Sequence, residues 1–316
     1  MYRLLVGAVL AALMSWPAAR VAADSKQDAF LDLARRGWVY ELRTTMVGRD
    51  LSIPVSINGR DLAGASLCLV GERPREATRE VLTAFRALMY EAHGKPVPMR
   101  FAGPTARLCG AGRVVVLRLF SNRPPNAALT DDLTWMNAVH QLGLPQGRVY
   151  AAASPAMAQT FFGRRGSGTH IMVKQPGSDS LSPLERDFYR SILIEELYQS
   201  FTFGMDILHL DRSAPYLSKL EEFPVDLTRM PWDSRAFMRG LLGSNPRGLC
   251  EFDVFMLHAV ATSDVAQTTE AAFLDDIRRR WPELIERTAA SMADARFAPI
   301  LDADCRGETP PASEKG

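Results

Sequence analysis

The sequence predicts an exported α+β protein in which a small mixed sheet packs against one buried central helix, followed by a helical C-terminal part. Three observations indicate this class: an N-terminal segment with the pattern of an export signal, apolar strand-like runs alternating with helical repeats, and one helix that is apolar on every side. The formal charge of +1 gives no global electrostatic reason to expect nucleic acid or an anionic membrane as partner.

Residues 1–23 have the features of a secretory signal peptide. Arg3 supplies a positive start, Leu4 to Met14 is an unbroken apolar run, and Val21-Ala22-Ala23 fits a small-residue cleavage site. A membrane anchor needs roughly 20 apolar residues, and Arg20 interrupts the segment too early for that. We therefore expect a periplasmic or secreted protein whose mature chain has no transmembrane segment.

The cysteines agree with export, because all of them follow the cleavage site and form an even set: Cys68, Cys109, Cys250 and Cys305. No C-x-x-C pair is present, which disfavours a zinc ribbon or a thioredoxin-like site and favours structural disulfides. Three pairings are open, and sequence proximity favours Cys68 with Cys109 and Cys250 with Cys305.

We expect the mature chain to comprise one main domain with two flanking parts. Residues 24–65 form an N-terminal helix and strands that pack on the main domain, which spans residues 66–296. Residues 297–316 are polar and contain prolines, so they predict a largely disordered tail that Cys305 tethers.

Helices in the first half are predicted from apolar residues at helical spacing and from their stop signals. Residues 25–36 form an amphipathic helix before Gly37, and residues 74–92 form another before Gly94. A third helix begins at Thr130, which acidic residues follow, and ends before Gly143.

Strands are predicted where apolar runs are bounded by glycine and proline. The clearest is residues 113–120, which are rich in valine and leucine. The others, of which the first two would form a hairpin, are expected at residues 39–44, 51–57, 67–70, 148–153 and 169–175. The glycine-rich residues 163–168 lack the ending of a phosphate-binding loop and predict a flexible connection.

The central helix is the most informative segment. Ser182, Pro183 and Glu185 form a capping-box start, and Gly204 is the natural stop. Between them apolar residues point to all sides, so we expect the second half of the helix to be buried on every face. That buried stretch contains the polar sequence Glu195-Glu196-Leu197-Tyr198-Gln199, whose carboxylates and amide are costly to bury unless they are paired, protonated or bound to a ligand.

The spacing of these polar residues matches that of the metallopeptidase H-E-x-x-H helix. Glu195 and Gln199 are four residues apart on one face and stand where the two zinc-binding histidines would be, while Glu196 keeps the position of the catalytic glutamate. The purely structural alternative is a buried polar network that fixes the helix against the sheet.

The segment resembles a family of exported bacterial proteins of unknown function with the pattern Glu-Glu-Leu-x-Gln, then Leu-Gly-Leu and Asn-Asp. Glu195 to Gln199 match in full and Asp206 stands at the final aspartate, whereas Thr202 and Met205 depart from the pattern. A later stretch, Asp253 to Leu257, is similar to that family's Asp-x-x-Met-Leu element. The resemblance implies a zincin-like fold with altered zinc ligands, and it establishes no activity.

The residue types decide which chemistry is feasible. A glutamine amide is a poor zinc ligand and none of the five histidines restores the pattern, so we expect no zinc cofactor. Glu195, Glu196 and Asp206 could hold a hard divalent cation.

Two functional hypotheses remain. The first is a non-catalytic or pseudo-enzymatic cell-envelope protein that binds a peptide, a glycan or a protein through Glu195, Gln199 and Asp206. The second is a divergent hydrolase, peptidase-like, that uses Glu196 as general base.

Overall fold

The computed structural model describes residues 25–41, 55–302 and 305. Its centre is a five-stranded sheet in the order β2-β1-β3-β5-β4, in which β4 runs antiparallel to β5 and the other neighbours are parallel. The strands are β1 (Ser66–Gly71), β2 (Met99–Gly103), β3 (Val114–Phe120), β4 (Ala156–Gly163) and β5 (Gly166–Lys174). The expected combination of helices with a small mixed sheet is thus confirmed.

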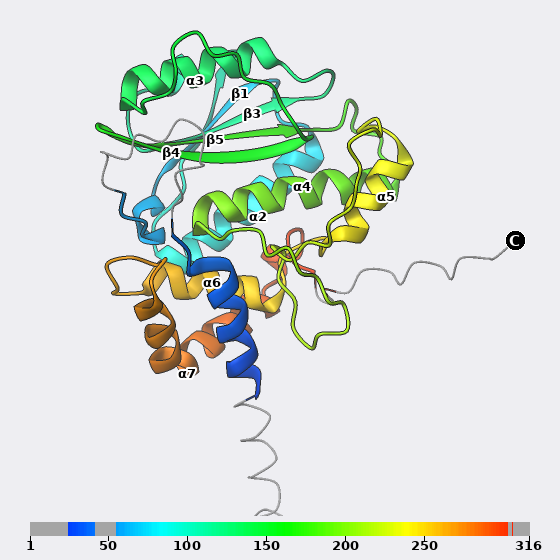
Figure 1. The fold of residues 1–316 in the computed structure, drawn as a ribbon. Helices are drawn as coiled ribbons and strands as arrows, with labels where there is room; N and C mark the ends of the chain where they lie inside the picture. Colours follow the sequence, from blue (N-terminus) through cyan, green and yellow to red (C-terminus); the bar gives the residue numbers. More distant parts are fainter. Residues whose placement is uncertain (1–24, 42–54, 303–304, 306–316) are drawn as a thin grey trace, which may run out of the picture.

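The sheet separates two helical layers, which Figure 1 shows above and below it. The helices α2 (Glu76–His93) and α4 (Pro183–Thr202) cover one face, and α3 (Asn126–His140) covers the other. The alternation of side chains along the strands explains both cores. In β1 and β3, Leu67 and Val115 join the core under α2 and α4, while their neighbours Cys68 and Val116 join the core under α3.

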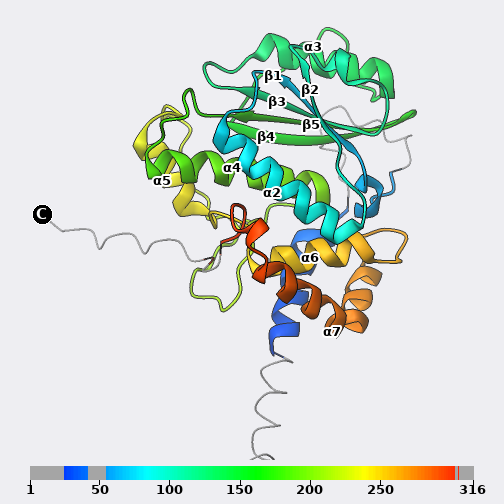
Figure 2. The same ribbon diagram turned by 180° about the vertical axis from the view of Figure 1, so that it is seen from behind.

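The C-terminal part is helical, as predicted. It contains α5 (Arg235–Ser244), α6 (Glu251–Thr262) and α7 (Ala271–Ala293). The N-terminal helix over residues 25–38 packs beside α6 and α7, which Figure 2 shows from behind. Phe30 of this helix makes edge-to-face contacts with Phe252, Phe255 and Trp281, at centroid distances of 5.0–5.5 Å. Aromatic packing therefore joins the two ends of the described chain.

Several strand predictions are wrong. Residues 148–153 form no strand, because the Tyr150 amide donates to Thr130 Oγ1 at 2.9 Å and the segment lies along α3 instead of joining a ladder. Of the hairpin expected near the N-terminus, residues 39–41 and 55–57 are irregular, and the remainder lies outside the described residues.

Two strands, β2 and β4, were not expected, and the predicted flexible connection at residues 163–168 is a hairpin. Gly163 ends β4 and Gly166 begins β5, with Arg164 and Arg165 as the turn. The antiparallel pairing extends to Gly163 opposite Gly166, so the ladder itself fixes these residues.

Two helix ends differ from the predictions for physical reasons. Helix α3 starts at Asn126, and Thr130 donates its hydroxyl to the Asn126 carbonyl at 2.9 Å instead of capping the helix. Helix α4 has the predicted capping box and ends at Thr202, with Phe203 in the left-handed region at φ 57°. Gly204 serves close packing, because a Cβ there would lie 2.5 Å from Leu220 Cδ1.

Both disulfides form with the pairing that sequence proximity favours, Cys68–Cys109 and Cys250–Cys305. No helix in the described ranges is long and apolar enough to cross a membrane. The predicted signal peptide and the last eleven residues of the predicted tail lie outside the described residues.

Candidate functional site

A cavity of about 310 Å³ lies between the edge strand β4 and the central helix α4. The helix contributes the polar residues that the sequence singles out, and the strand contributes small side chains. The lining comprises Ser154, Pro155, Ala156, Met157, Ala158, Ile192, Glu195, Glu196, Gln199, Asp206, Glu222, Leu241 and Asn245. The structure therefore brings all four predicted site residues of the motif region to one place.

The β4 strand presents a backbone edge to this cavity. Its inner side is bonded to β5, where the Lys174 amide donates to the Pro155 carbonyl at 2.7 Å. Hydrogen-bonded and non-hydrogen-bonded pairs alternate in an antiparallel ladder, so the N–H and C=O groups of Ala156, Ala158 and Thr160 point outward. The described part of the chain places no further strand against that edge.

Glu195 is buried, and its partners inside the protein include an amide and a cation. Its Oε2 accepts a hydrogen bond from Asn245 Nδ2 at 2.6 Å and lies 2.9 Å from the ammonium of Lys219. Lys219 is fully buried and also donates to Ser191 Oγ at 2.9 Å and to the Pro246 carbonyl at 2.7 Å. The carboxylate and the ammonium thus form a buried pair, and the three donor positions of the ammonium all have partners.

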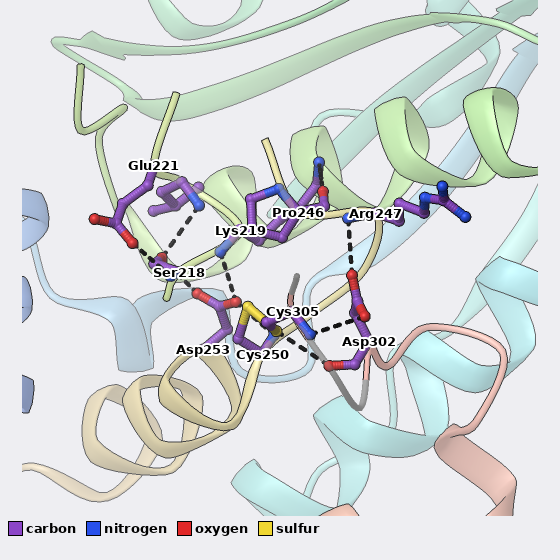
Figure 3. Close-up of a disulfide and its surroundings, with 10 residues drawn as sticks. Ser218, Lys219, Glu221, Pro246, Arg247, Cys250, Asp253, Asp302 and Cys305 are labelled. Carbon is purple, nitrogen blue, oxygen red and sulfur yellow. Dashed lines mark hydrogen bonds between the residues drawn. A yellow bond between two sulfur atoms is a disulfide. The ribbon is translucent and has the colours of Figure 1, made fainter. Parts of the chain in front are cut away.

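The segment that carries Lys219 is fixed by Asp253 at the start of α6 (Figure 3). Asp253 accepts hydrogen bonds from Ser218 Oγ at 2.6 Å, the Lys219 amide at 2.8 Å and the Cys250 amide at 2.7 Å. Cys250 forms the disulfide with Cys305 at the same point. The aspartate of the predicted Asp-x-x-Met-Leu element therefore positions the lysine that pairs with Glu195.

Burial and mutual repulsion perturb the other carboxyl groups of the cavity. The pKa of Glu222 rises to about 8 through burial and the charges of Glu195 and Asp206. The pKa of Glu196 rises well above its ordinary value through burial and the same neighbouring charges. Asp206 lies at the open side of the cavity, and its pKa rises to about 6 because the surrounding protein displaces water and Glu195 is close. Crowded carboxyl groups of this kind are typical of functional sites.

Glu196 and Gln199 are half-buried, so the prediction of burial on every face of α4 is wrong on the side that faces the cavity. The Gln199 amide donates a hydrogen bond to Asp206 Oδ1. The glutamine therefore satisfies a carboxylate, but one in the loop after the helix and not one in the helix itself.

The cluster has the geometry for a hard cation. Carboxylate oxygens of Glu195, Asp206 and Glu222 lie within 4.8 Å of one another, and an ion with oxygen ligands at about 2.4 Å could touch all three. Glu222 takes the place that the sequence assigned to Glu196. The described residues that line the cavity include neither histidine nor cysteine, the ligands that zinc prefers.

A second cavity, of about 190 Å³, continues along β4 and is lined mainly by apolar groups. Ala158, Gln199 and Asp206 line both cavities. Its other lining residues are Tyr40, Ile57, Gln159, Thr160, Phe162, Ser200, Phe203, Gly204 and Met205.

Lys219, Glu222 and Asn245 are site residues that sequence reasoning missed. Lys219 and Glu222 lie in the irregular residues 203–234, where periodicity carries no information about which side chains face inward. Asn245 directly follows the end of α5. The one available signal was the run of Lys219, Glu221 and Glu222 beside the apolar Leu217 and Leu220, since charged residues in such company are often buried in pairs.

Comparison of the chain with protein-family models, curated proteins and solved structures gave no match.

Proposed function

We propose that this chain is an exported, non-catalytic cell-envelope protein of zincin-like architecture that binds an extended peptide in the cleft between β4 and α4. The observation that carries the proposal is the position of the two cavities: both lie between the outward edge of β4 and the Glu-Glu-Leu-x-Gln face of α4. The two disulfides support export. The motif helix beneath an antiparallel edge strand supports the zincin-like assignment.

A peptide suits this edge better than a glycan. The outward N–H and C=O groups of Ala156, Ala158 and Thr160 repeat every second residue along the strand. A peptide added as a sixth strand pairs with these groups, sharing or displacing the hydrogen bond that the Ser154 hydroxyl donates to the Ala156 carbonyl, while its alternate side chains enter the two cavities. A glycan has hydroxyl groups with no matching repeat.

The surroundings of Glu195 support a binding role over metal-dependent hydrolysis. The ammonium of Lys219 lies 2.9 Å from the carboxylate that stands where the first zinc-binding histidine would be. A zinc ion at that carboxylate would be repelled by a buried positive charge. Gln199 adds only an amide at the second position.

The binding role is tested by blocking the strand edge. Ala158→Pro removes one outward N–H and leaves the β5 ladder intact, whereas Ala158→Val keeps that N–H with similar bulk. With a library of acetylated, amidated heptapeptides, we expect the wild-type and valine proteins to bind and the proline protein to lose binding. Equal binding by the proline protein would show that the edge is not used.

The alternative, a divergent hydrolase, rests on Glu196. Its carboxyl lines the cavity, and burial raises its pKa well above the usual value, so it binds a proton more readily than an exposed glutamate does. Under this alternative Glu196→Gln abolishes peptide hydrolysis while leaving peptide binding and the unfolding free energy unchanged. Hydrolysis that survives this substitution excludes the role.

A further inference from the structure

The cavity beside Glu195 holds more carboxyl groups than the described cations of the protein can pair with. Four carboxyl groups line it, those of Glu195, Glu196, Asp206 and Glu222. The nearby cation is Lys219, whose three donor positions are taken by Glu195, Ser191 and the Pro246 carbonyl. Within residues 25–41 and 55–302, no Lys, Arg or His forms an ion pair with Glu196, Asp206 or Glu222.

Asn245 is an independent sign of a missing donor. It is 1 % exposed and lines the cavity. Its Nδ2 donates to Glu195 at 2.6 Å, whereas its Oδ1 is buried without any hydrogen-bond partner among the described residues. A buried acceptor left unpaired costs free energy, and a ligand that carries N–H groups would remove that cost.

The neighbouring cavity has a different character and lies at a defined distance along the strand. The acidic cavity is lined by β4 residues centred on Ala156, and the apolar cavity by residues centred on Thr160. Residues at this separation are roughly 13 Å apart in a strand and face the same side. Ser200, at the apolar cavity, also has a buried hydroxyl without a partner in the described structure.

We propose that the acidic cavity is a subsite for the cationic side chain of a lysine or arginine in the bound peptide, and that the apolar cavity takes an apolar side chain two or four residues away. This inference rests on the proposed peptide binding. The ammonium or guanidinium group donates to Asp206, Glu222 and the free Oδ1 of Asn245. Charge-assisted hydrogen bonds of this kind are among the strongest in proteins.

The size of the cavity favours a side chain over a bare ion. Its volume of about 310 Å³ is at the lower end of the range for organic ligands, roughly 300–1,000 Å³. Lys219 also places an ammonium beside Glu195. Its repulsion weakens the binding of a divalent ion more than the binding of a singly charged group that approaches from the Asp206 side.

The test measures selectivity instead of affinity alone. A positional-scanning library of acetylated, amidated heptapeptides is bound to the mature protein, and the best member is compared with its Lys→norleucine analogue. We expect enrichment of lysine or arginine at one position and of leucine or phenylalanine two or four positions away. The norleucine analogue should bind about tenfold more weakly or worse.

Matched variants locate the selectivity. In the protein with Asp206→Asn and Glu222→Gln, the lysine-to-norleucine ratio should fall to about one. The control protein with Asp131→Asn and Glu80→Gln loses the same charge at exposed positions elsewhere and should keep the ratio. The inference is overturned if peptides bind without a preference for a basic residue, or if that preference survives in the protein with Asp206→Asn and Glu222→Gln. In either case the proposed function stands.

A small probe decides the case in which no peptide binds and the proposed function fails. Amide resonances are compared in n-butylammonium chloride, n-butanol and calcium chloride. Shifts at Glu222 and Asn245 with butylammonium and not with butanol support a cationic subsite. Equal shifts, no shifts, or a response to calcium alone overturn it.

Discussion

The ammonium of Lys219 lies 2.9 Å from Glu195 Oε2, so the first residue of the Glu-Glu-Leu-x-Gln motif is paired with a buried cation. Lys219 has no exposed surface, and Glu195 has almost none. The pair binds the segment after α4 to the helix that forms the floor of the cleft. The Lys219–Glu195 pair therefore stabilises the fold in addition to neutralising charge in the cavity.

Lys219→Met should destabilise the protein by about 3–5 kcal/mol, because it leaves the Glu195 carboxylate buried without its partner. The measurement is the free energy of unfolding in urea at neutral pH. Lys26→Met is the control, since the pair between Lys26 and Glu251 is partly exposed and should cost less than about 1 kcal/mol.

The double substitution of Lys219→Met with Glu195→Gln separates pairing from packing. Removing both charges should recover much of the loss. A double variant as unstable as Lys219→Met alone would show that the lysine acts through its packing and not through Glu195.

Gly204→Ala should destabilise the protein by about 1–3 kcal/mol through overpacking. An added Cβ would lie 2.5 Å from Leu220 Cδ1 and 2.7 Å from Trp38 Cζ2, and both side chains are fully buried. Gly177→Ala is the matched control, because nothing lies within 4 Å of its Cβ position. Equal unfolding midpoints for the two variants would contradict the packing observed after α4.

Replacing Cys250 and Cys305 together by serine should cost about 4 kcal/mol, the chain-entropy value for a loop of this size; the bridge spans 55 residues. The bridge also lies beside Asp253, which holds the Lys219 segment (Figure 3). We therefore expect the amides of Ser218 and Lys219 to exchange faster in the variant. Unchanged stability and exchange would mean that Asp253 positions this segment without the disulfide.

Two largely buried histidines should each lower the free energy of unfolding on acidification, against the opposite contribution of the cavity carboxyl groups, whose pKa values are raised. Burial is the main cause that lowers the pKa of His93 from 6.5 to about 4, and the same holds for His258. Between pH 6.5 and pH 4 these two histidines bind more protons in the unfolded chain than in the folded chain. Their contribution to stability is therefore complete above pH 6.5 and is lost as the pH falls toward 4. As the pH falls over this range, the urea midpoint of the His258→Gln protein should therefore rise relative to that of the control His209→Gln, whose side chain is exposed. Parallel profiles would exclude His258 as a cause.

The parts of the fold that were predicted correctly are those that local sequence determines. Helix α4 has its capping box at Ser182 and Glu185 because both residues act within one turn. Strand β4 was missed because its sequence, Ala-Met-Ala-Gln-Thr-Phe-Phe-Gly, has weak strand propensity. Its conformation depends on pairing with β5, and local propensity does not reveal such pairing.

The residues of the site that lie on α4 were predicted, together with Asp206 in the loop after the helix. Glu195, Glu196 and Gln199 follow from the spacing within a single helix. Lys219 and Glu222 reach the cavity from a long irregular stretch that Asp253 helps to hold in place, and Asn245 follows the end of α5. Such convergence depends on tertiary contacts, which no periodicity encodes.

The most direct test of peptide binding at β4 is amide hydrogen exchange, resolved by residue, with and without a saturating heptapeptide from the library. The amides of Ala156, Ala158 and Thr160 point outward and should become protected on binding. The amides of Met157 and Gln159 bond to β5 and should change little. Protection confined to other parts of the chain, or equal protection of both sets, would contradict the addition of the peptide to this edge.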